Sequence, residues 1–272
     1  MAYYPDISHW KPISNWDQVK QACPFLISKA TQGTNFVDSY LGTFISKCEE
    51  YQIPYWLYTF LDKGNEKAQA EFMVKVCKPL VGKYFRGYIL DVEQNNTAVG
   101  VRDALVYLQT QSEKTMLYTM YAQYGNYLSV INMRGNKCAW WEARYGANTG
   151  SYSMPCHVGA DLHQYTSRGD CPGIGAGVDL NRLTGTKDED WFTGAKQPEP
   201  EPKEEEDMTG LIINGGKIYY YNIEAKAMWH VPNPDCLTLL KEEYKRKYGK
   251  EIQYMDASKY ETLKKLIKGK SV

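Results

Sequence analysis

The sequence lacks the features by which several large classes of protein are recognised. Its 272 residues carry 32 basic and 32 acidic side chains, and a chain without net charge is not expected to be a general nucleic-acid binder. No apolar run approaches the roughly 20 residues that cross a membrane, so no membrane span is expected. Residues 1–5 contain neither a basic stretch nor an apolar core, and we therefore expect no secretory signal.

Cysteine and histidine occur in numbers and spacings that do not build their usual sites. The seven cysteines are odd in number and include no C-x-x-C pair. This favours free, mostly buried thiols made in a reducing compartment over a disulfide framework. The four histidines show no metal-ligand spacing, so we expect no metal site.

Proline and glutamate are concentrated in one segment, residues 195–207, which reads AKQPEPEPKEEED. Alternating proline favours a stiff polyproline II spacer, and the acids that follow keep it solvated. The segment divides the chain into a domain at 1–194 and a second at 208–272. The second domain has 12 basic and 7 acidic residues, a surplus that suits a module meeting an anionic surface.

Short apolar runs alternate with helical patterns in residues 1–194. Such alternation favours parallel strands joined by crossover helices, and about eight strands in so short a domain predict an irregular (β/α) barrel. The expected fold class is α/β, with a small α+β domain after the spacer. The expected strands are 3–7, 25–30, 55–60, 87–92, 115–120, 139–143, 161–166 and 177–181, and the clearest helices are 15–22, 39–51, 66–81 and 99–112.

Carboxylates stand at the predicted ends of three strands, where barrel enzymes carry their chemistry. Asp91 and Glu93 are two positions apart and therefore point to the same side, while Asp6 and Asp179 end the first and last strands. Two such close acids cannot both ionise freely, so the more enclosed one should keep its proton near neutrality and serve as a general acid. Glycosidic cleavage needs an acid beside a second carboxylate. Simple capping of strand ends is the alternative, and three strand ends facing one cup disfavour it.

Many short motifs follow one another along residues 3–185: DISHW, ISKATQGTNFVD, YTF, YILDVE, LYTMYAQY, WWEARYG, HQYTS and GIGAGVDLN. In order and spacing, these motifs resemble those of the glycoside hydrolase family 25 lysozymes. The resemblance implies an irregular β/α barrel, no cofactor, and cleavage of the bond from N-acetylmuramic acid to N-acetylglucosamine in bacterial peptidoglycan.

The resemblance also implies a role for each acid. Glu93 is similar to the general acid of the family, and Asp91 to the partner that orients the 2-acetamido group of the muramic acid. That group would then act as the internal nucleophile, through an oxazolinium-like intermediate and with retention. Asp6 and Asp179 are similar to the two further carboxylates that line the same cup.

Aromatic and polar residues at or near strand ends are candidate substrate contacts. The alternative for each aromatic residue is a place in the barrel core, and the family match favours the platform role for Tyr58, Tyr118 and Trp141. This chain departs from the family where His163 replaces the usual tryptophan of W-Q-Y and where Gln32 replaces a usual glutamate. The full set of candidates is Tyr58, Phe60, Tyr118, Trp141, Gln164, Tyr165 and Arg144.

Residues 208–272 predict a small α+β unit. A hairpin turn is expected at Asn214-Gly215-Gly216, and a helix is expected to begin at Asn233-Pro234 and end at Gly249. A strand at 250–255 and a last helix at 256–268 would follow. Because family 25 enzymes commonly carry such a module, wall binding through exposed Tyr220 and Trp229 is one hypothesis; burial of both residues in a small core is the other. Self-association through this unit is a further hypothesis.

The favoured interpretation is a phage endolysin, made in the host cytoplasm without a signal peptide and released to the wall by a holin-type pore. A chitinase-like glycosidase is an alternative, although Ile89 and Arg86 stand where that family expects acids. A catalytically inactive carbohydrate-binding barrel is another. The purine-rich codons of residues 203–207 also suggest an internal translation start at Met208, which would produce the second domain separately.

Overall fold

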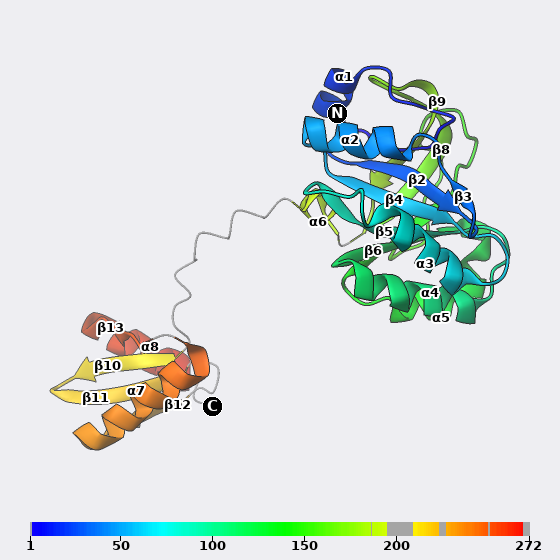
Figure 1. Ribbon diagram of the computed structural model, residues 1–272. Coiled ribbons are helices and arrows are strands. Elements are labelled where there is room, and N and C mark those ends of the chain that lie inside the picture. Colours follow the sequence, from blue (N-terminus) through cyan, green and yellow to red (C-terminus); the bar gives the residue numbers. More distant parts are fainter. Residues whose placement is uncertain (1, 186, 195–208, 223–226, 250, 269–272) are drawn as a thin grey trace. The chain divides into compact units, whose positions relative to one another are not determined.

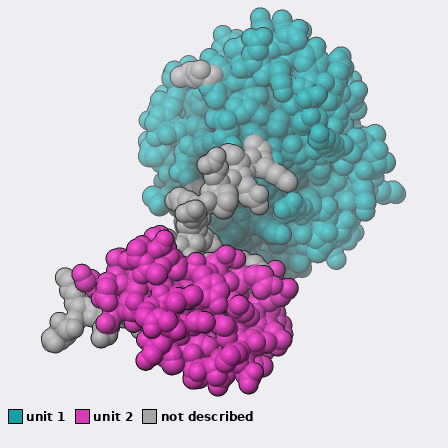
Figure 2. Space-filling model, turned by 90° about the vertical axis from the view of Figure 1, so that its left-hand side faces the viewer, with its two compact units in different colours: residues 1–196 teal, residues 197–272 magenta. Residues whose placement is uncertain are grey.

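Figure 1 shows the computed structural model, which describes residues 2–185, 187–194, 209–222, 227–249 and 251–268. The chain forms two compact units, residues 1–196 and 197–272, coloured separately in Figure 2. The predicted spacer at 195–207 and the proposed internal start at Met208 lie outside the described residues.

The first unit is a closed barrel. Its strands follow the order β1-β9-β8-β7-β6-β5-β4-β2, and β2 pairs with β1 to complete the ring, while a short β3 (Phe36–Val37) adds to β2 from outside it. All neighbours in the ring are parallel except those of β9. The barrel prediction is therefore confirmed. The strands of the ring are β1 (Tyr4–Ile7), β2 (Leu26–Gln32), β4 (Tyr55–Phe60), β5 (Phe85–Val92), β6 (Lys114–Met120), β7 (Cys138–Ala143), β8 (Leu162–Cys171) and β9 (Gly175–Leu183).

Helices cover the outside of the ring, and Figure 1 shows α3, α4 and α5 side by side along β4, β5 and β6. The side chains of Asn15 and Thr97 cap the first turns of α1 and α4 by accepting backbone N–H bonds. The apolar faces of the helices and the outer faces of the strands share one core, which includes Phe44, Met73 and Leu105. The helices are α1 (Trp16–Ala22), α2 (Leu41–Tyr51), α3 (Glu66–Cys77), α4 (Ala98–Gln111), and α5 (Tyr124–Met133), which was not predicted.

A second core fills the interior of the ring with alternate side chains of the strands, including Ile27, Trp56 and Ile89. An unpredicted short helix, α6 (Glu189–Thr193), covers the amino-terminal ends of the strands. Its fully buried Phe192 stacks on Phe25, and its backbone oxygen accepts a bond of 3.0 Å from Trp56 Nε1. Since this end of the barrel is closed by packing, only the carboxyl ends of the parallel strands remain for a site.

The last two strands of the ring correct the prediction of regular alternation. β8 and β9 form an antiparallel hairpin, and the few residues between Cys171 and Gly175 leave no room for the crossover helix that parallel strands require. β9 then closes the ring against β1 in the opposite direction. Asp179 therefore lies in the middle of β9 rather than at its end, as had been predicted, and it is the register partner of Asp6.

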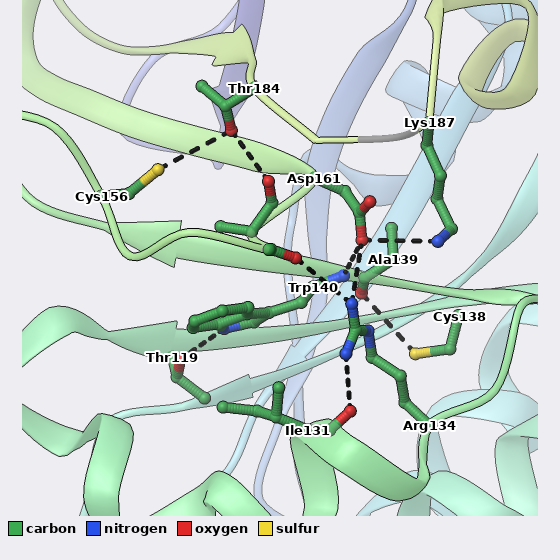
Figure 3. A network of polar contacts seen from close by, with 12 residues as sticks. Thr119, Ile131, Arg134, Cys138, Ala139, Trp140, Cys156, Asp161, Thr184 and Lys187 are labelled. Carbon is green, nitrogen blue, oxygen red and sulfur yellow. Dashed lines mark hydrogen bonds and ion pairs between the residues drawn. The ribbon is translucent and has the colours of Figure 1, made fainter.

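A buried acid outside the candidate cup ties the start of β8 to β7 (Figure 3). Asp161 is 1% exposed, and its Oδ2 accepts a bond of 2.9 Å from the backbone N–H of Trp140. Arg134 and Lys187 lie 3.5 and 3.4 Å from the same oxygen. These partners offset the cost of burying the charge, so Asp161 has a structural explanation.

The second unit is built on a four-stranded sheet in the order β12-β11-β10-β13. Leu211 and Ile212 alternate across the sheet and join separate cores, one with Tyr244 of α7 and the other with Leu263 of α8. β12 was not predicted, and the strand expected at 250–255 is reduced to two residues. The elements are β10 (Thr209–Asn214), β11 (Lys217–Asn222), β12 (Ala227–His230), α7 (Pro234–Tyr248), β13 (Tyr254–Met255) and α8 (Tyr260–Lys268).

Local signals define the turn and the main helix of this unit. Gly215 and Gly216 both have positive φ angles, of 57° and 74°, between β10 and β11. The side chain of Asn233 caps α7 by accepting a bond of 2.9 Å from Cys236 N, and Gly249 ends the helix with a φ of 70°. Trp229 is 51% exposed and stacks on the partly buried Tyr220, with ring centroids 5.6 Å apart.

All seven cysteines are free thiols, and five of them are buried. In the part of the chain that the structure describes, no helix combines the length and apolarity needed to cross a membrane.

Candidate active site

Four carboxyl groups meet at the open end of the barrel. They are supplied by β1 (Asp6), by the end of β5 (Asp91), by the residue that follows β5 (Glu93) and by the antiparallel β9 (Asp179). Asp6 and Asp91 are only 6% and 7% exposed, and the other two acids are partly buried. The structure thus brings together all four acids of the predicted cup.

Asp6 is held by a clamp of amide side chains. Gln164 Nε2 lies 2.9 Å from both carboxylate oxygens, and Asn181 Nδ2 donates to Oδ2 at 2.7 Å. Burial raises the pKa of Asp6 to about 6, although these donors oppose the rise by stabilising the anion. Asp6 is therefore mostly ionised at neutral pH and fixed in one orientation.

The amide side chains of Gln164 and Asn181 are in turn held by hydrogen bonds to their oxygen atoms. Tyr118 and Tyr145 donate from their hydroxyls to Gln164 Oε1, at 2.8 and 2.7 Å. Trp141 Nε1 donates to Asn181 Oδ1 at 2.7 Å. Since each amide oxygen accepts these bonds, each amide nitrogen must face Asp6. Tyr145 and Asn181 were not predicted as site residues, and a buried amide in a strand was the available signal for Asn181.

Asp91 and Glu93 form a pair that shares a proton. Burial raises the pKa of Asp91 well above its ordinary value, and the adjacent charge and hydrogen bond of Glu93 raise it further. Burial also raises the pKa of Glu93, but the bond from Asp91 and the charge of Lys29 oppose that rise. Two carboxyl groups can share a hydrogen bond only when one is protonated. Asp91 is the more enclosed acid of the pair, so the expectation that the more enclosed acid keeps the proton points to Asp91 in the free protein, not to Glu93.

One oxygen of this pair is left without a donor. Asp91 Oδ1 is buried and has no hydrogen-bond partner among the residues that the structure describes. A buried acceptor without a donor is costly. The vacant acceptor therefore marks the position where a donor group of a substrate would be stabilised.

The pKa of Asp179 is strongly raised. Burial raises its pKa from 3.8 to about 8, the charges of Asp6 and Glu93 add to the rise, and Lys11 opposes it. The Nζ of Lys11 is held by the backbone oxygen of Ala176 at 3.0 Å. At neutral pH, Asp179 is therefore mostly protonated and is a hydrogen-bond donor.

Lys29 is a site residue that sequence reasoning missed. Its ammonium donates to Gln32 Oε1 at 2.7 Å, and its charge acts on both Asp91 and Glu93. Burial lowers the pKa of Lys29, while the surrounding acids oppose that change. Lys29 could have been found because it is a charged residue inside an apolar strand, β2. The same signal identified Asp91.

The aromatic residues that were predicted as sugar platforms fall into two groups by their exposure to solvent. Tyr58 and Phe60 are partly exposed at the rim, as a platform requires. Tyr118 and Trp141 are 3% and 2% exposed and pack against each other edge to face at 4.4 Å. Tyr118 and Trp141 are therefore not open rings: they form the floor of the cup and orient the clamp on Asp6, and their contact with substrate stays a prediction.

Two other predicted contacts lie elsewhere. Tyr165 packs against the core between the ring and the helices, because neighbours on a strand face opposite sides and Gln164 faces inward. The guanidinium of Arg144 stacks on Tyr121, 3.7 Å from the ring centroid, and donates to Pro155 O at 2.7 Å. These contacts of Tyr165 and Arg144 lie outside the carboxyl cup, and a role of either residue in substrate binding stays a prediction.

Comparison with known proteins agrees with the barrel and its position in the chain. The sequence model of Glycosyl hydrolases family 25 matches residues 5–174. Lysozyme M1 of Streptomyces globisporus is 24% identical over 208 residues, which cover 66% of this chain and 67% of that protein.

Two solved structures show the same fold. A glycosyl hydrolase 25 of Streptococcus pneumoniae, the virulence factor GHIP, superimposes with a TM-score of 0.61 at 22% identity, over 70% of this chain and 91% of that one. The catalytic domain of endolysin ply40, from bacteriophage P40 of Listeria monocytogenes, has a TM-score of 0.60 at 24% identity, over 68% and 93% of the two chains.

Proposed function

Because this chain belongs to glycosyl hydrolase family 25, we propose that it is a lysozyme that hydrolyses the β-1,4 bond between N-acetylmuramic acid and N-acetylglucosamine in bacterial peptidoglycan. The observation that carries the proposal is the Asp91–Glu93 pair, a buried and a partly buried acid at the open end of the barrel, both with raised pKa values. The relative named Lysozyme M1 supports this assignment of substrate.

Glu93 is the general acid in this mechanism. Its proton passes to the glycosidic oxygen as the bond to C1 of the muramic acid breaks. The oxygen of the 2-acetamido group attacks C1 and forms an oxazolinium-like ring, and water then opens the ring after giving a proton to Glu93. The two displacements at C1 retain its configuration.

Asp91 supports these steps as an anion, whereas Glu93 acts in its protonated form. A substrate acetamide N–H that donates to the vacant Oδ1 of Asp91 stabilises the Asp91 anion. The shared proton then moves to Glu93, where the leaving oxygen needs it. The Asp91 anion also stabilises the positive charge that develops on the acetamide. Substrate binding thus converts the resting pair into its reactive form.

Asp6 and Asp179 do not transfer protons in this mechanism. They bind the substrate and adjust the pKa values of the neighbouring acids. Asp6 supplies a fixed negative charge that raises the pKa values of Asp91 and Asp179. Protonated Asp179 is available to donate a hydrogen bond to a sugar oxygen. These roles explain why one of the two further acids is held by donors and the other is left partly exposed.

The same proposal includes a phage endolysin with a wall-binding second unit. An endolysin of a bacteriophage shares the barrel fold, and free cysteines suit synthesis in the cytoplasm of a host before holin-type release. In the second unit, the surplus of basic residues and the exposed Trp229 suit contact with an anionic wall. We also propose self-association as a second role of this unit.

The deciding experiment identifies the new sugar ends. Purified peptidoglycan is digested, the reducing ends are reduced with borohydride, and the products are identified by mass spectrometry. Reduced muramic acid is the expected product. Reduced glucosamine would make the enzyme a glucosaminidase, and the absence of any new sugar end would refute the glycosidase proposal.

A further inference from the structure

Trp10 is unusually open for a tryptophan. It lies just beyond β1, four residues after Asp6, and 79% of its surface is exposed. A large aromatic ring normally buries most of its area in a core or an interface. Because Trp10 contributes little to the core, its position next to the cup calls for a function at the surface.

The ring of Trp10 rests on a rigid base. The His9 ring lies against it with centroids 4.5 Å apart. His9 is fixed twice by Asp38 Oδ2, through Nδ1 at 2.7 Å and through its backbone N–H at 3.2 Å. Asp38 is only 2% exposed, and its other oxygen accepts a bond from Tyr40 N at 2.8 Å. The indole therefore lies open to solvent beside a histidine ring that is itself held in place.

A continuous row of rings and one cation joins Trp10 to the cup. The ring of Phe36, itself 41% exposed, lies 6.1 Å from that of His9. The ammonium of Lys29 lies 5.4 Å from the centroid of Phe36 and 5.1 Å from that of Phe60. The same ammonium acts on Asp91 and Glu93. His9, Trp10 and Phe36, which we call the rim patch, are therefore continuous with the reaction site.

We propose that the rim patch is a sugar-binding subsite, with Trp10 stacking on a pyranose ring of the glycan strand beyond the sugars that lie over the carboxyl cup. The inference rests on the proposed function and adds a positioning residue to it. The apolar face of a pyranose matches the flat face of an exposed indole, and the fixed His9 ring lies against that indole at 4.5 Å.

A length series of soluble glycan strands tests the subsite. Trp10→Ala should lower kcat/KM on long strands by roughly three- to tenfold, which is the range of a single aromatic contact. The loss should come from KM with kcat preserved, and it should vanish on the shortest strand that is cleaved. Trp10→Phe should recover most of the loss, because it restores a flat ring.

The control is Leu80→Ala, which removes a 47% exposed apolar side chain from the loop that leads into the amino-terminal end of β5 and should leave cleavage of soluble strands unchanged. An equal effect of Trp10→Ala on all lengths, or no effect on any, would overturn the subsite while leaving the proposed function intact. If the wild-type protein cleaves no strand, both proposals fail together.

Discussion

Asp6 and Asp179 are register partners across the antiparallel pair β1–β9, so two acids from opposite ends of the domain face each other in one sheet. Burial, with the charge of Asp6 added to it, raises the pKa of Asp179 to about 8, whereas burial raises the pKa of Asp6 only to about 6 because the amide clamp opposes the rise. The two acids therefore carry different charges over most of the neutral range. This asymmetry leads to the first prediction.

Asp179→Asn should stabilise the protein at alkaline pH. An acid whose folded pKa is raised gives its full stability below the unfolded value, here 3.8, and loses it as the pH rises through the folded value of about 8. Asparagine never ionises and avoids this loss. The melting temperature of the variant should thus exceed that of the wild type increasingly from pH 4 to pH 8, and then level off.

Calorimetric or circular-dichroism melts across this range measure the difference. Asp170→Asn is the matched control, because Asp170 is an exposed residue of the same β8–β9 hairpin, and it should show no such trend. A constant difference at all pH values would contradict the burial of a titrating Asp179.

Glu93→Gln should abolish cleavage of peptidoglycan while the fold and wall binding persist. Loss of a general acid typically costs about 10²- to 10⁴-fold in rate. Release of reducing ends measures it. Glu113→Gln, at an exposed position just before β6, should keep full activity. Substantial residual cleavage by the Glu93 variant would show that another group is the acid.

Gln164→Met should raise the pKa of Asp6 above about 6. The substitution keeps the side-chain length but removes the amide that donates to both oxygens of Asp6. Carboxyl NMR of labelled aspartate follows this titration directly. Tyr165→Phe, at the neighbouring outward position of β8, should leave it unchanged; a shift of the same size in both variants would refute the clamp.

Gly87→Ala should destabilise the barrel by at least about 2 kcal/mol, within the usual range for overpacking. A Cβ at residue 87 would lie 2.1 Å from the backbone oxygen of Lys114 and 2.7 Å from the ring of Trp56. Gly42→Ala, in α2 with no atom within 4 Å of the added Cβ, should instead stabilise by roughly 0.5–1 kcal/mol. Urea unfolding compares the two; equal effects would contradict the packing described.

Ending the chain after residue 196 should weaken wall attachment without loss of the barrel. The first unit is compact and has both of its cores in residues 1–196. Sedimentation with purified walls, using Glu93→Gln in both lengths to prevent digestion, measures attachment, and thermal melting reports on the barrel. Equal binding by the two lengths would leave the second unit without the proposed role.

Several features could be predicted from the sequence because they depend on local patterns. Alternating apolar runs and helical periods indicated the barrel, and acids at the ends of apolar strands indicated the cup. The turn at Gly215-Gly216 and the cap at Asn233 were equally local. The turn and the cap each follow from a few consecutive residues, whereas the barrel and the cup follow from patterns repeated along residues 1–194.

The tertiary structure decided what depends on neighbours far apart in the chain. The antiparallel direction of β9 placed Asp179 opposite Asp6. The alternation of side chains along β8 turned Tyr165 outward and Gln164 inward. Exposure separated Trp141, buried in the floor, from Trp10, open at the rim. The sequence by itself determined which chemical groups the barrel would carry. Burial, direction and charge proximity arise only on closure of the ring, and they decided which acids are enclosed and which rings are open to solvent.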